Sequence, residues 1–536
     1  MFMKINSKIL IFTMLVMMIC CVTAVSATDT NGTDDTVITD EIAVDDVSEI
    51  VEDVEIDEST DSADDSPATT SKVVTVTDTD YGKCFDSNGY LNDTAVTELT
   101  FSGNFSAKSF GNFKINKTIP LNVAGATFND VSFDLLADNL VLDGARFVYN
   151  TNGAVVYVNS DNDVVQNLNI VVNTPSTADT FAIRVEEASN VQILSNVITY
   201  TALTANPSCY NHVIRVEGGK NVTVSRNNIT AYLPLKEVDF LQPYPSIYTD
   251  KVAGVAVQSS EEFKFTYNKL EVYVSRNNTG YPTLDAFIIA DCEGAEIIGN
   301  TIIEIDNETQ PGNRNYLYAV DVYQCNDIHI DNNTIHLESQ GGSIIPGTTN
   351  GTGAAYGIQL TGGHTGVNIS NNDIYTSNNG PNCGIYSQNF IDETELFITG
   401  NTIYVEGNAV SNHEWSLVTG MELQDDYAYI EDNTITVYNK AVFNTGDPVY
   451  GISYSQWSPR DHVYEIYNNI VNVINGDYAV YLLSAEDTTV NDNCLDTANY
   501  CCDSAVVIVS GSNNDVSDNY CSQCPNCPNC PNCPHN

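Results

Sequence analysis

Basic residues are scarce in this sequence. Its 536 residues include 20 Lys and Arg against 70 Asp and Glu, which gives a formal net charge of −50 at pH 7. A chain with this charge stays soluble, attracts cations and repels polyanions. The composition therefore excludes nucleic acid as a partner and argues against binding to anionic lipid.

Long apolar runs are missing as well, except at the N-terminus. Lys4 and Lys8 flank the start of an apolar stretch over residues 9–25, and small residues follow up to Ala27. This pattern is typical of a signal peptide over residues 1–27; an uncleaved membrane anchor is the alternative. No later run approaches the roughly 20 apolar residues that span a bilayer. We expect a secreted protein at the cell surface, with no transmembrane segment after the signal peptide.

Apolar sequence is also sparse over residues 28–72. From Asp29 to Ser66 the chain carries 16 acidic residues and no Lys or Arg. Such a segment cannot bury enough apolar surface to offset the entropy that ordering costs. We predict an acidic disordered stalk over residues 28–72.

The rest of the chain carries an internal repeat. A short motif centred on asparagine, as in IIGNTI and ITGNTI, recurs eleven times with a mean period of about 32 residues. Repeats of this length are typical of solenoids. In the ninth copy Asn468 is as good an anchor as its neighbour. The anchor asparagines are Asn196, Asn227, Asn268, Asn300, Asn333, Asn372, Asn401, Asn433, Asn469, Asn493 and Asn519.

Strands are predicted on both sides of each anchor. The positions three before and two after it are apolar in every copy, as Ile297 and Ile302 are around Asn300. The neighbouring residues alternate with period two, which indicates short strands, and a third strand precedes most copies, as in YAVDVYQ and YGIQLTG. Three short strands per repeat predict an all-β parallel solenoid whose coils stack about 4.8 Å apart.

The anchor asparagine has two expected roles. It tolerates the left-handed backbone conformation that a sharp corner needs, and its amide can hydrogen-bond to the equivalent amides one coil above and below. We predict one β-helix over residues 73–520, with residues 73–125 as an irregular N-terminal cap, followed by a Cys/Pro-rich tail over residues 521–536.

These coils resemble the right-handed parallel β-helix superfamily, the pectate-lyase-like architecture of pectate lyases, polygalacturonases and many surface proteins. Together with the signal peptide and acidic stalk, they resemble adhesin-like surface proteins of methanogenic archaea. The resemblance covers roughly residues 73–520 and implies a single-stranded right-handed parallel β-helix. It implies less about function, because unrelated chemistries share this scaffold. Two hypotheses follow: an adhesin-like or structural protein that binds glycans or other surface polymers, and a polysaccharide lyase or glycoside hydrolase.

The candidate catalytic residues lie in FAIRVEE and VIRVEGG. Arg184 and Arg215 are 31 residues apart, as are Glu186 and Glu217, so the equivalents should stack. A retaining glycosidase needs two carboxyl groups about 5–5.5 Å apart. However, adjacent arginines lower a carboxyl pKa, whereas a general acid needs a raised one. A solvated ladder of ion pairs is the preferred interpretation, and we favour binding over catalysis.

The candidate binding residues lie in insertions at the third corner. The longest insertion, residues 232–250, contains Tyr232, Phe240, Tyr244 and Tyr248, and a nearby one contains Tyr281. Insertions in a solenoid gather on one side and commonly bind ligands. Aromatic rings among Asn and Asp suit a surface polysaccharide or glycoprotein as partner; local packing of these rings is the alternative.

The cysteines form no dense disulfide framework. Cys292 and Cys325 are 33 residues apart, as are Asn300 and Asn333. They should therefore stack one coil apart, within range of a disulfide if their side chains turn toward each other.

The tail CSQCPNCPNCPNCPHN has proline at regular intervals, which favours polyproline II with a rise of about 3.1 Å per residue. Its thiols would then lie about 9 Å apart along one edge, which favours disulfide-linked multimers over disulfides within the chain. Cys-x-x-Cys is also good zinc-site spacing, so metal binding stays open. The tail cysteines are Cys521, Cys524, Cys527, Cys530 and Cys533.

The stretch CNDIHIDNNTIHLES places His329 and His336 close together, as a metal site does. Both are out of phase with the core and lie on different strands, so we place them on the solvent face. We expect no cofactor, with calcium or zinc as the open alternatives. Asn-x-Ser/Thr sequons permit glycosylation of the outer face, among them Asn92, Asn221, Asn228, Asn307, Asn332 and Asn368.

Overall fold

The computed structural model describes residues 71–106, 111–203, 209–234, 236–237, 252–276, 282–307, 316–340, 354–389, 394–407, 418–424, 427–440, 449–454, 463–476, 478–498 and 500–521. The predicted signal peptide, the predicted stalk up to residue 70 and the tail after Cys521 lie outside these ranges.

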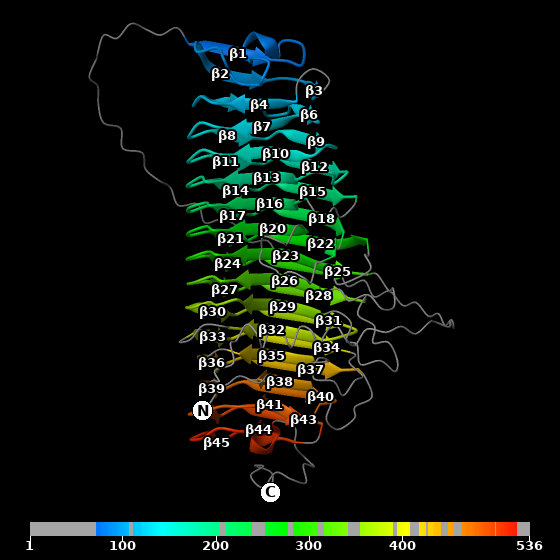
Figure 1. The fold of residues 1–536 in the computed structure, drawn as a ribbon, viewed down its shortest axis with the longest axis vertical. Helices are drawn as coiled ribbons and strands as arrows, with labels where there is room; N and C mark the ends of the chain where they lie inside the picture. The colour runs from blue at the N-terminus through cyan, green and yellow to red at the C-terminus, as the bar shows by residue number, and fades with distance from the viewer. Residues whose placement is uncertain are drawn as a thin grey trace, which may run out of the picture. The chain divides into compact units, whose positions relative to one another are not determined.

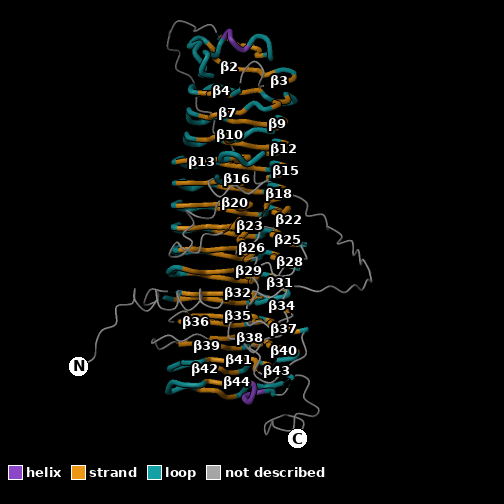
Figure 2. Tube along the Cα trace, turned by 45° about the vertical axis from the view of Figure 1, so that its right-hand side comes forward, coloured by secondary structure: helices purple, strands orange, loops and turns teal. Residues whose placement is uncertain are grey.

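Three long parallel sheets, here called I, II and III, form the fold (Figures 1 and 2). Each complete coil contributes one strand to each sheet in that order, and within a sheet each strand pairs in parallel with its equivalents in the adjacent coils. In sheet I, for example, β26 (Tyr316–Tyr323) lies in parallel between β23 (Pro282–Ala290) and β29 (Ala354–Thr361). The chain is a right-handed parallel β-helix with three strands per coil, as predicted.

Sheet I has the longest strands. The short strand β19 (Lys236–Glu237) joins its edge by antiparallel pairing with β23. Besides the three strands above, it contains β4 (Asn112–Ile115), β7 (Ser132–Leu135), β10 (Gly153–Val158), β13 (Thr180–Glu186), β16 (Asn211–Glu217), β20 (Val252–Gln258), β32 (Asn382–Gln388), β35 (Val418–Gln424), β38 (Val449–Tyr454), β41 (Tyr478–Leu482) and β44 (Val506–Ile508).

Sheet II has the shortest strands, and from β14 onward each carries the apolar position before an anchor. Its strands are β8 (Val141–Asp143), β11 (Val164–Gln166), β14 (Gln192–Leu194), β17 (Thr223–Ser225), β21 (Lys264–Thr266), β24 (Glu296–Ile298), β27 (His329–Asp331), β30 (Val367–Ser370), β33 (Glu395–Thr399), β36 (Tyr427–Glu431), β39 (Val463–Tyr467), β42 (Thr489–Asn491) and β45 (Asp515–Ser517).

Sheet III follows each anchor and carries the second apolar position. Its strands are β3 (Asn104–Ser106), β6 (Thr127–Asn129), β9 (Arg146–Tyr149), β12 (Asn169–Thr174), β15 (Val197–Ala202), β18 (Asn228–Pro234), β22 (Lys269–Arg276), β25 (Thr301–Asp306), β28 (Thr334–Ser339), β31 (Asp373–Asn378), β34 (Thr402–Gly407), β37 (Thr434–Asn439), β40 (Ile470–Ile474) and β43 (Cys494–Thr497).

The anchor asparagines form a continuous buried ladder between sheets II and III, as predicted. Asn300 is typical: its backbone N–H and its Nδ2 both donate to Oδ1 of Asn333, each at 2.9 Å, and Nδ2 also donates to the carbonyl of Phe265 at 2.7 Å. In the ninth coil the ladder residue is Asn469, whose Nδ2 donates to Oδ1 of Asn493 at 2.9 Å.

The predicted left-handed conformation of the anchors is wrong. The left-handed residue is the one before each anchor, such as Asn332 with φ 54° and Asn468 with φ 54°. The reason is geometric. The anchor must turn its amide inward to reach the neighbouring coils, so the exposed residue before it takes the backbone reversal.

Both ends of the stacked coils are closed. At the N-terminal end β1 (Lys72–Val76), β2 (Val96–Phe101) and β5 (Leu121–Asn122) form a separate sheet, with a 3₁₀ turn η1 (Tyr81–Lys83). Sheets I and III already begin at β4 and β3, within the stretch expected to be a cap. At the other end a 3₁₀ turn, η2 (Cys502–Ala505), brings Asp503 to the last ladder residue, Asn519, whose Nδ2 donates to its Oδ1 at 2.8 Å.

A row of mostly small residues runs through the middle strands of sheet I: Gly254, Ala286, Ala319, Gly357, Gly384, Gly420, Gly451 and Ala479. At Gly357, Gly384 and Gly420 an added Cβ would lie 2.5–2.7 Å from a carbonyl oxygen of the next coil. In these strands the residue in the row and the residue after it both face inward. The strand bends there, and the nearest outer side chains before and after the bend are therefore three positions apart in the sequence.

No helix among the described residues has the length and apolarity needed to cross a bilayer.

Candidate functional site

The outer face of sheet I gathers the side chains that have no role in the core. In β26, Leu317, Val320 and Val322 belong to the buried core, and Tyr318 and Asp321 lie on the opposite face. Register carries the two outer positions from coil to coil. The row through Tyr318 is Phe181, His212, Ala253, Asp285, Tyr318, Tyr356, Cys383, Thr419, Tyr450 and Tyr478. The row through Asp321 is Arg184, Arg215, Ala256, Ile288, Asp321, Gln359, Tyr386, Glu422, Ser453 and Tyr481.

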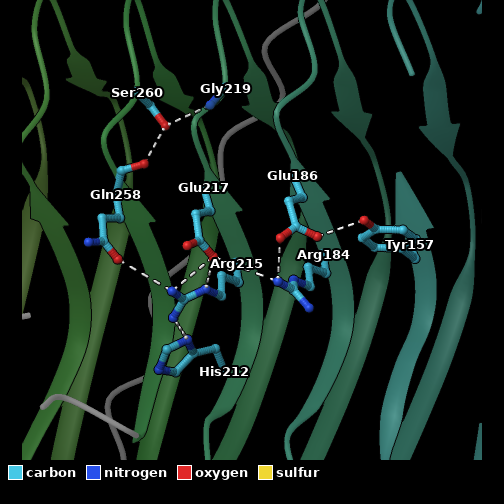
Figure 3. Close-up of polar contacts among 9 residues, drawn as sticks. All are labelled: Tyr157, Arg184, Glu186, His212, Arg215, Glu217, Gly219, Gln258 and Ser260. Carbon is cyan, nitrogen blue, oxygen red and sulfur yellow. Dashed lines mark hydrogen bonds and ion pairs between the residues drawn. The ribbon is translucent and has the colours of Figure 1, made fainter. Parts of the chain in front are cut away.

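The predicted Arg–Glu ladder occupies the N-terminal part of this face (Figure 3). Arg184 pairs in register with Arg215, and Glu186 with Glu217. A terminal nitrogen of Arg184 lies 2.8 Å from Glu186 and 3.7 Å from Glu217, and that of Arg215 lies 3.0 Å from Glu217. The four side chains form one alternating network of charges.

Further polar groups complete this network (Figure 3). The hydroxyl of Tyr157 donates to Glu186 at 2.6 Å, and Arg215 donates to Oε1 of Gln258 at 3.3 Å. Burial and the hydrogen bond to Glu186 raise the pKa of Tyr157, so its hydroxyl remains a donor. The guanidinium of Arg215 also lies 4.6 Å from the ring centre of Tyr210, within cation–π range.

This arrangement favours an ion-pair network over an acid–base pair. Each carboxylate makes a direct ion pair with an arginine, so both carboxyl groups are already engaged by a neighbouring charge. Arg215 keeps only 9% of its side-chain surface exposed, so Glu217 compensates a largely buried charge. We retain Glu186 and Glu217 as structural residues of sheet I.

A second group lies further along the same face. We call Tyr318, Tyr356 and Tyr386 with Asp285, Asp321 and Glu422 the tyrosine–carboxylate run. The rings of Tyr318 and Tyr356 stack with centroids 5.5 Å apart and an interplanar angle of 4°. The ring of Tyr386 follows at 5.0 Å and 53°. Three successive coils thus place one ring each on this face.

Three carboxyl groups accompany these rings. Asp285 and Glu422 are each 1% exposed, and Asp321 is 7% exposed. Gln359 donates to Asp321 at 3.2 Å, and the hydroxyl of Ser453 donates to Glu422 at 2.6 Å. Asp321 and Glu422 are three coils apart in register, or about 14 Å. That separation excludes the two as one catalytic pair.

Burial, and to a lesser extent the neighbouring groups, keeps these tyrosines protonated. The pKa of Tyr318 is raised well above its ordinary value, mainly by burial and then by Tyr356 and Asp321. The pKa of Tyr356 is raised for the same main reason, with Tyr386 next. Both hydroxyls therefore stay protonated at neutral pH, where they can donate hydrogen bonds.

An apolar patch separates the Arg–Glu ladder from the tyrosine–carboxylate run. Ala253, Ala256, Ile288 and Ala290 pack together with Tyr323 as a cluster distinct from the core. Ala253, Ala256 and Ile288 occupy the two outer rows, so these rows run through the patch from the arginines to Tyr481.

Of the predicted binding residues, only Tyr232 lies among the described residues. It is 41% exposed on β18, and its ring stacks on that of Tyr273 at 5.4 Å. It belongs to sheet III and not to the face described above. Four predicted residues lie outside the described ranges: Phe240, Tyr244, Tyr248 and Tyr281.

Cys292 and Cys325 stack one coil apart, as the spacing predicts. The backbone N–H of Cys292 donates to the sulfur of Cys325 at 3.4 Å, and Ser260 makes the same contact to Cys292 at 3.4 Å. Both cysteines are buried free thiols here, so the disulfide stays a prediction. Cys521 is a buried thiol too, and the tail cysteines 524, 527, 530 and 533 lie outside the described residues.

The two histidines lie where the repeat places them. His329 is exposed on β27, in register between Glu296 and Asn368. His336 stacks on Tyr375 at 4.7 Å, and its Nε2 lies 3.7 Å from Glu338. Within the described ranges no three His, Cys, Asp or Glu side chains are grouped to hold a metal ion.

The sequence carried a signal for the tyrosine–carboxylate run that was not read as a site. Its residues occupy equivalent places in YAVDVYQ, YGIQLTG and CGIYSQN, which were identified only as strands. Strict alternation along YAVD puts Tyr318 and Asp321 on opposite faces, whereas the bend at the small-residue row puts both outside.

No protein-family model and no curated protein sequence matches the chain. Among solved structures the chain is similar to the Dettilon tailspike protein, at 13% identity and a TM-score of 0.45. The similarity covers 71% of this chain and 62% of the tailspike chain, so it spans less than two thirds of the length of the tailspike chain. It is similar to the periplasmic alginate epimerase AlgG, at 10% identity and a TM-score of 0.36 over 77% and 83% of the two chains. The Streptococcus pneumoniae surface protein and adhesin PfbA is similar at 11% identity and a TM-score of 0.37, over 83% of this chain and 100% of that one. The fold assignment rests on the strand pairing of the chain itself.

Proposed function

We propose that this is an exported cell-surface protein that binds uncharged glycans along the outer face of sheet I. The observation that carries the proposal is the tyrosine–carboxylate run, in which three consecutive coils each place a tyrosine ring on this face and three carboxyl groups lie beside or beyond the rings. Aromatic faces pack against sugar rings, and carboxylates accept charge-assisted hydrogen bonds from hydroxyl groups. One coil advances about 4.8 Å, close to the length of one sugar unit in an extended glycan.

The charge of the chain selects among glycans. The carboxylates of the run and the net charge of −50 disfavour uronic acid and sulfated polymers. The positions of the sequons are compatible with binding at this face. Within the described residues no sequon asparagine lies on a strand of sheet I. Glycans attached at Asn221, Asn332 or Asn368 would lie outside the strands of sheet I.

Catalysis is the second candidate, and Asp285 and Asp321 are the pair that it would use. They lie on the neighbouring strands β23 and β26, on the same outer face. A glycan-cleaving activity abolished by Asp321→Asn would convert the binding proposal into an enzymatic one.

The deciding experiment uses the full-length exported protein and a panel of cello-, chito-, manno- and alginate oligosaccharides. Calorimetry measures binding, and a reducing-end assay on the same mixtures measures turnover. We expect binding to at least one neutral oligosaccharide, none to alginate, and no new reducing ends. Tight binding to alginate alone would contradict the charge argument, and absence of binding to all four would remove the proposal.

The tail is proposed to join chains to each other or to a surface component. Its support is the sequence geometry, in which thiols about 9 Å apart along a polyproline II segment cannot pair with their neighbours. Non-reducing electrophoresis should show thiol-sensitive multimers that disappear when residues 522–536 are deleted. A monomeric, reduced protein with bound zinc would favour a metal site instead.

A further inference from the structure

One strand of sheet III carries carboxyl groups into the core. In β25 the side chains of Ile302, Glu304 and Asp306 face inward at alternate positions, the same three that are buried in β28, β31 and β34. Glu304 and Asp306 are both 0% exposed. The hydroxyl of Ser339, one coil further on, donates to Asp306 at 3.4 Å.

Glu304 occupies a position that is apolar in the adjoining coils. Its in-register neighbours are Val272 on β22 and Leu337 on β28, both fully buried in the core. Among the described residues neither of its carboxyl oxygens has a hydrogen-bond partner. A carboxylate in such a place lacks the partners that offset the loss of its hydration.

Asp306 is the titratable group that faces Glu304 among the described residues. The inner side chains of β22, β28, β23 and β26 are apolar or carry a hydroxyl group. Among the side chains that the structure describes, the charged ones of these strands lie on outer faces: Lys269, Glu271, Asp285, Asp321, His336 and Glu338. The tyrosines of these strands lie on outer faces as well. Burial, with the carboxyl of Asp306 second, raises the pKa of Glu304 well above its ordinary value of 4.5.

We propose that Glu304 makes the middle of this solenoid sensitive to pH. The folded coil buries this side chain in its neutral form, and ionisation of the carboxyl group at higher pH destabilises the coil. The inference is independent of the proposed glycan binding. Its consequence is a protein whose central coils are most stable in acidic surroundings and open first in alkaline ones.

The direction follows from proton linkage. In the unfolded chain Glu304 loses its proton around pH 4.5, whereas in the fold the proton is retained to a higher pH. The fold therefore binds the proton more tightly. The contribution of Glu304 to the stability of the fold is therefore fully present below pH 4.5 and is lost as pH rises toward its raised pKa.

The test compares urea unfolding of the full-length protein with that of Glu304→Gln between pH 4 and pH 8. The ratio of the two unfolding equilibrium constants should change by up to tenfold per pH unit above about pH 4.5, because one proton is linked to unfolding. Glu304→Leu, which restores the apolar column of Val272 and Leu337, should show the same loss of pH dependence. It also keeps the test valid if the glutamine variant does not fold.

Glu293→Gln is the matched control, because Glu293 is exposed in the same coil. This variant should keep the wild-type pH dependence. An unchanged pH dependence in both Glu304 variants would overturn the proposal, as would a wild-type stability that is level from pH 4.5 to pH 8.

Discussion

Removing one rung of the asparagine ladder should break the stack of coils at that point. In Asn333→Ala, four side-chain hydrogen bonds are lost: Nδ2 no longer donates to Asn372 at 2.9 Å or to Ile297 at 2.7 Å, and Oδ1 no longer accepts two bonds at 2.9 Å from Asn300. A net of about 1 kcal/mol for each bond gives a destabilisation of about 4 kcal/mol. Loss at one coil interface also weakens its neighbours in a repeat protein.

Chemical denaturation, followed by circular dichroism, measures this cost in the full-length protein, and hydrogen exchange locates it. Exchange should rise in β24, β27 and β30, the strands around the missing rung. Asn332→Gly is the matched control, because Asn332 is exposed with φ 54° and glycine adopts that conformation readily. If Asn333→Ala cost less than about 1 kcal/mol, comparable to a single surface substitution, the ladder would not hold the coils together.

Three further changes test other parts of the fold. Asp503→Ala removes the acceptor for Asn519 and should unfasten the last coil, seen as faster hydrogen exchange over residues 515–521 with the rest unchanged. Gly420→Ala places a Cβ 2.5 Å from a carbonyl of the next coil and should cost about 1–3 kcal/mol in chemical denaturation, whereas Gly111→Ala, with open space around it, should cost less than half as much. Burial raises the pKa of Asp163 from 3.8 to about 6, so stability should fall as pH rises from about 4 to 6; Asp163→Asn should flatten this window in urea titrations.

The coil architecture was predictable because its causes are periodic. The apolar positions around Asn300 recur at the repeat period, and stacking then fixes which residues are neighbours. Equal spacing was sufficient to place Arg184 beside Arg215, and Cys292 beside Cys325. These predictions needed only the count of residues between equivalent positions.

Features that depend on local geometry were not predictable in the same way. The backbone reversal falls on Asn332 and not on Asn333, because only one of two adjacent asparagines can turn inward. Tyr318 and Asp321 share a face because the strand bends between them, against the alternation of an ideal strand. Glu304 stands where a repeat-based reading expects an aliphatic residue, and its burial is decided by its neighbours.

The central claim is that the outer face of sheet I binds glycans, and a pair of tyrosine variants tests it most directly. Tyr356 belongs to the run on sheet I, and Tyr404 is stacked on Tyr375 at 5.6 Å on the outside of sheet III. The measurement is the dissociation constant for whichever neutral oligosaccharide the wild-type protein binds best. Tyr356→Ala should weaken binding at least tenfold, as the loss of about 1.4 kcal/mol of ring contact implies, and Tyr404→Ala should leave it unchanged. Equal affinities for wild type and Tyr356→Ala, or a loss confined to Tyr404→Ala, would contradict the account.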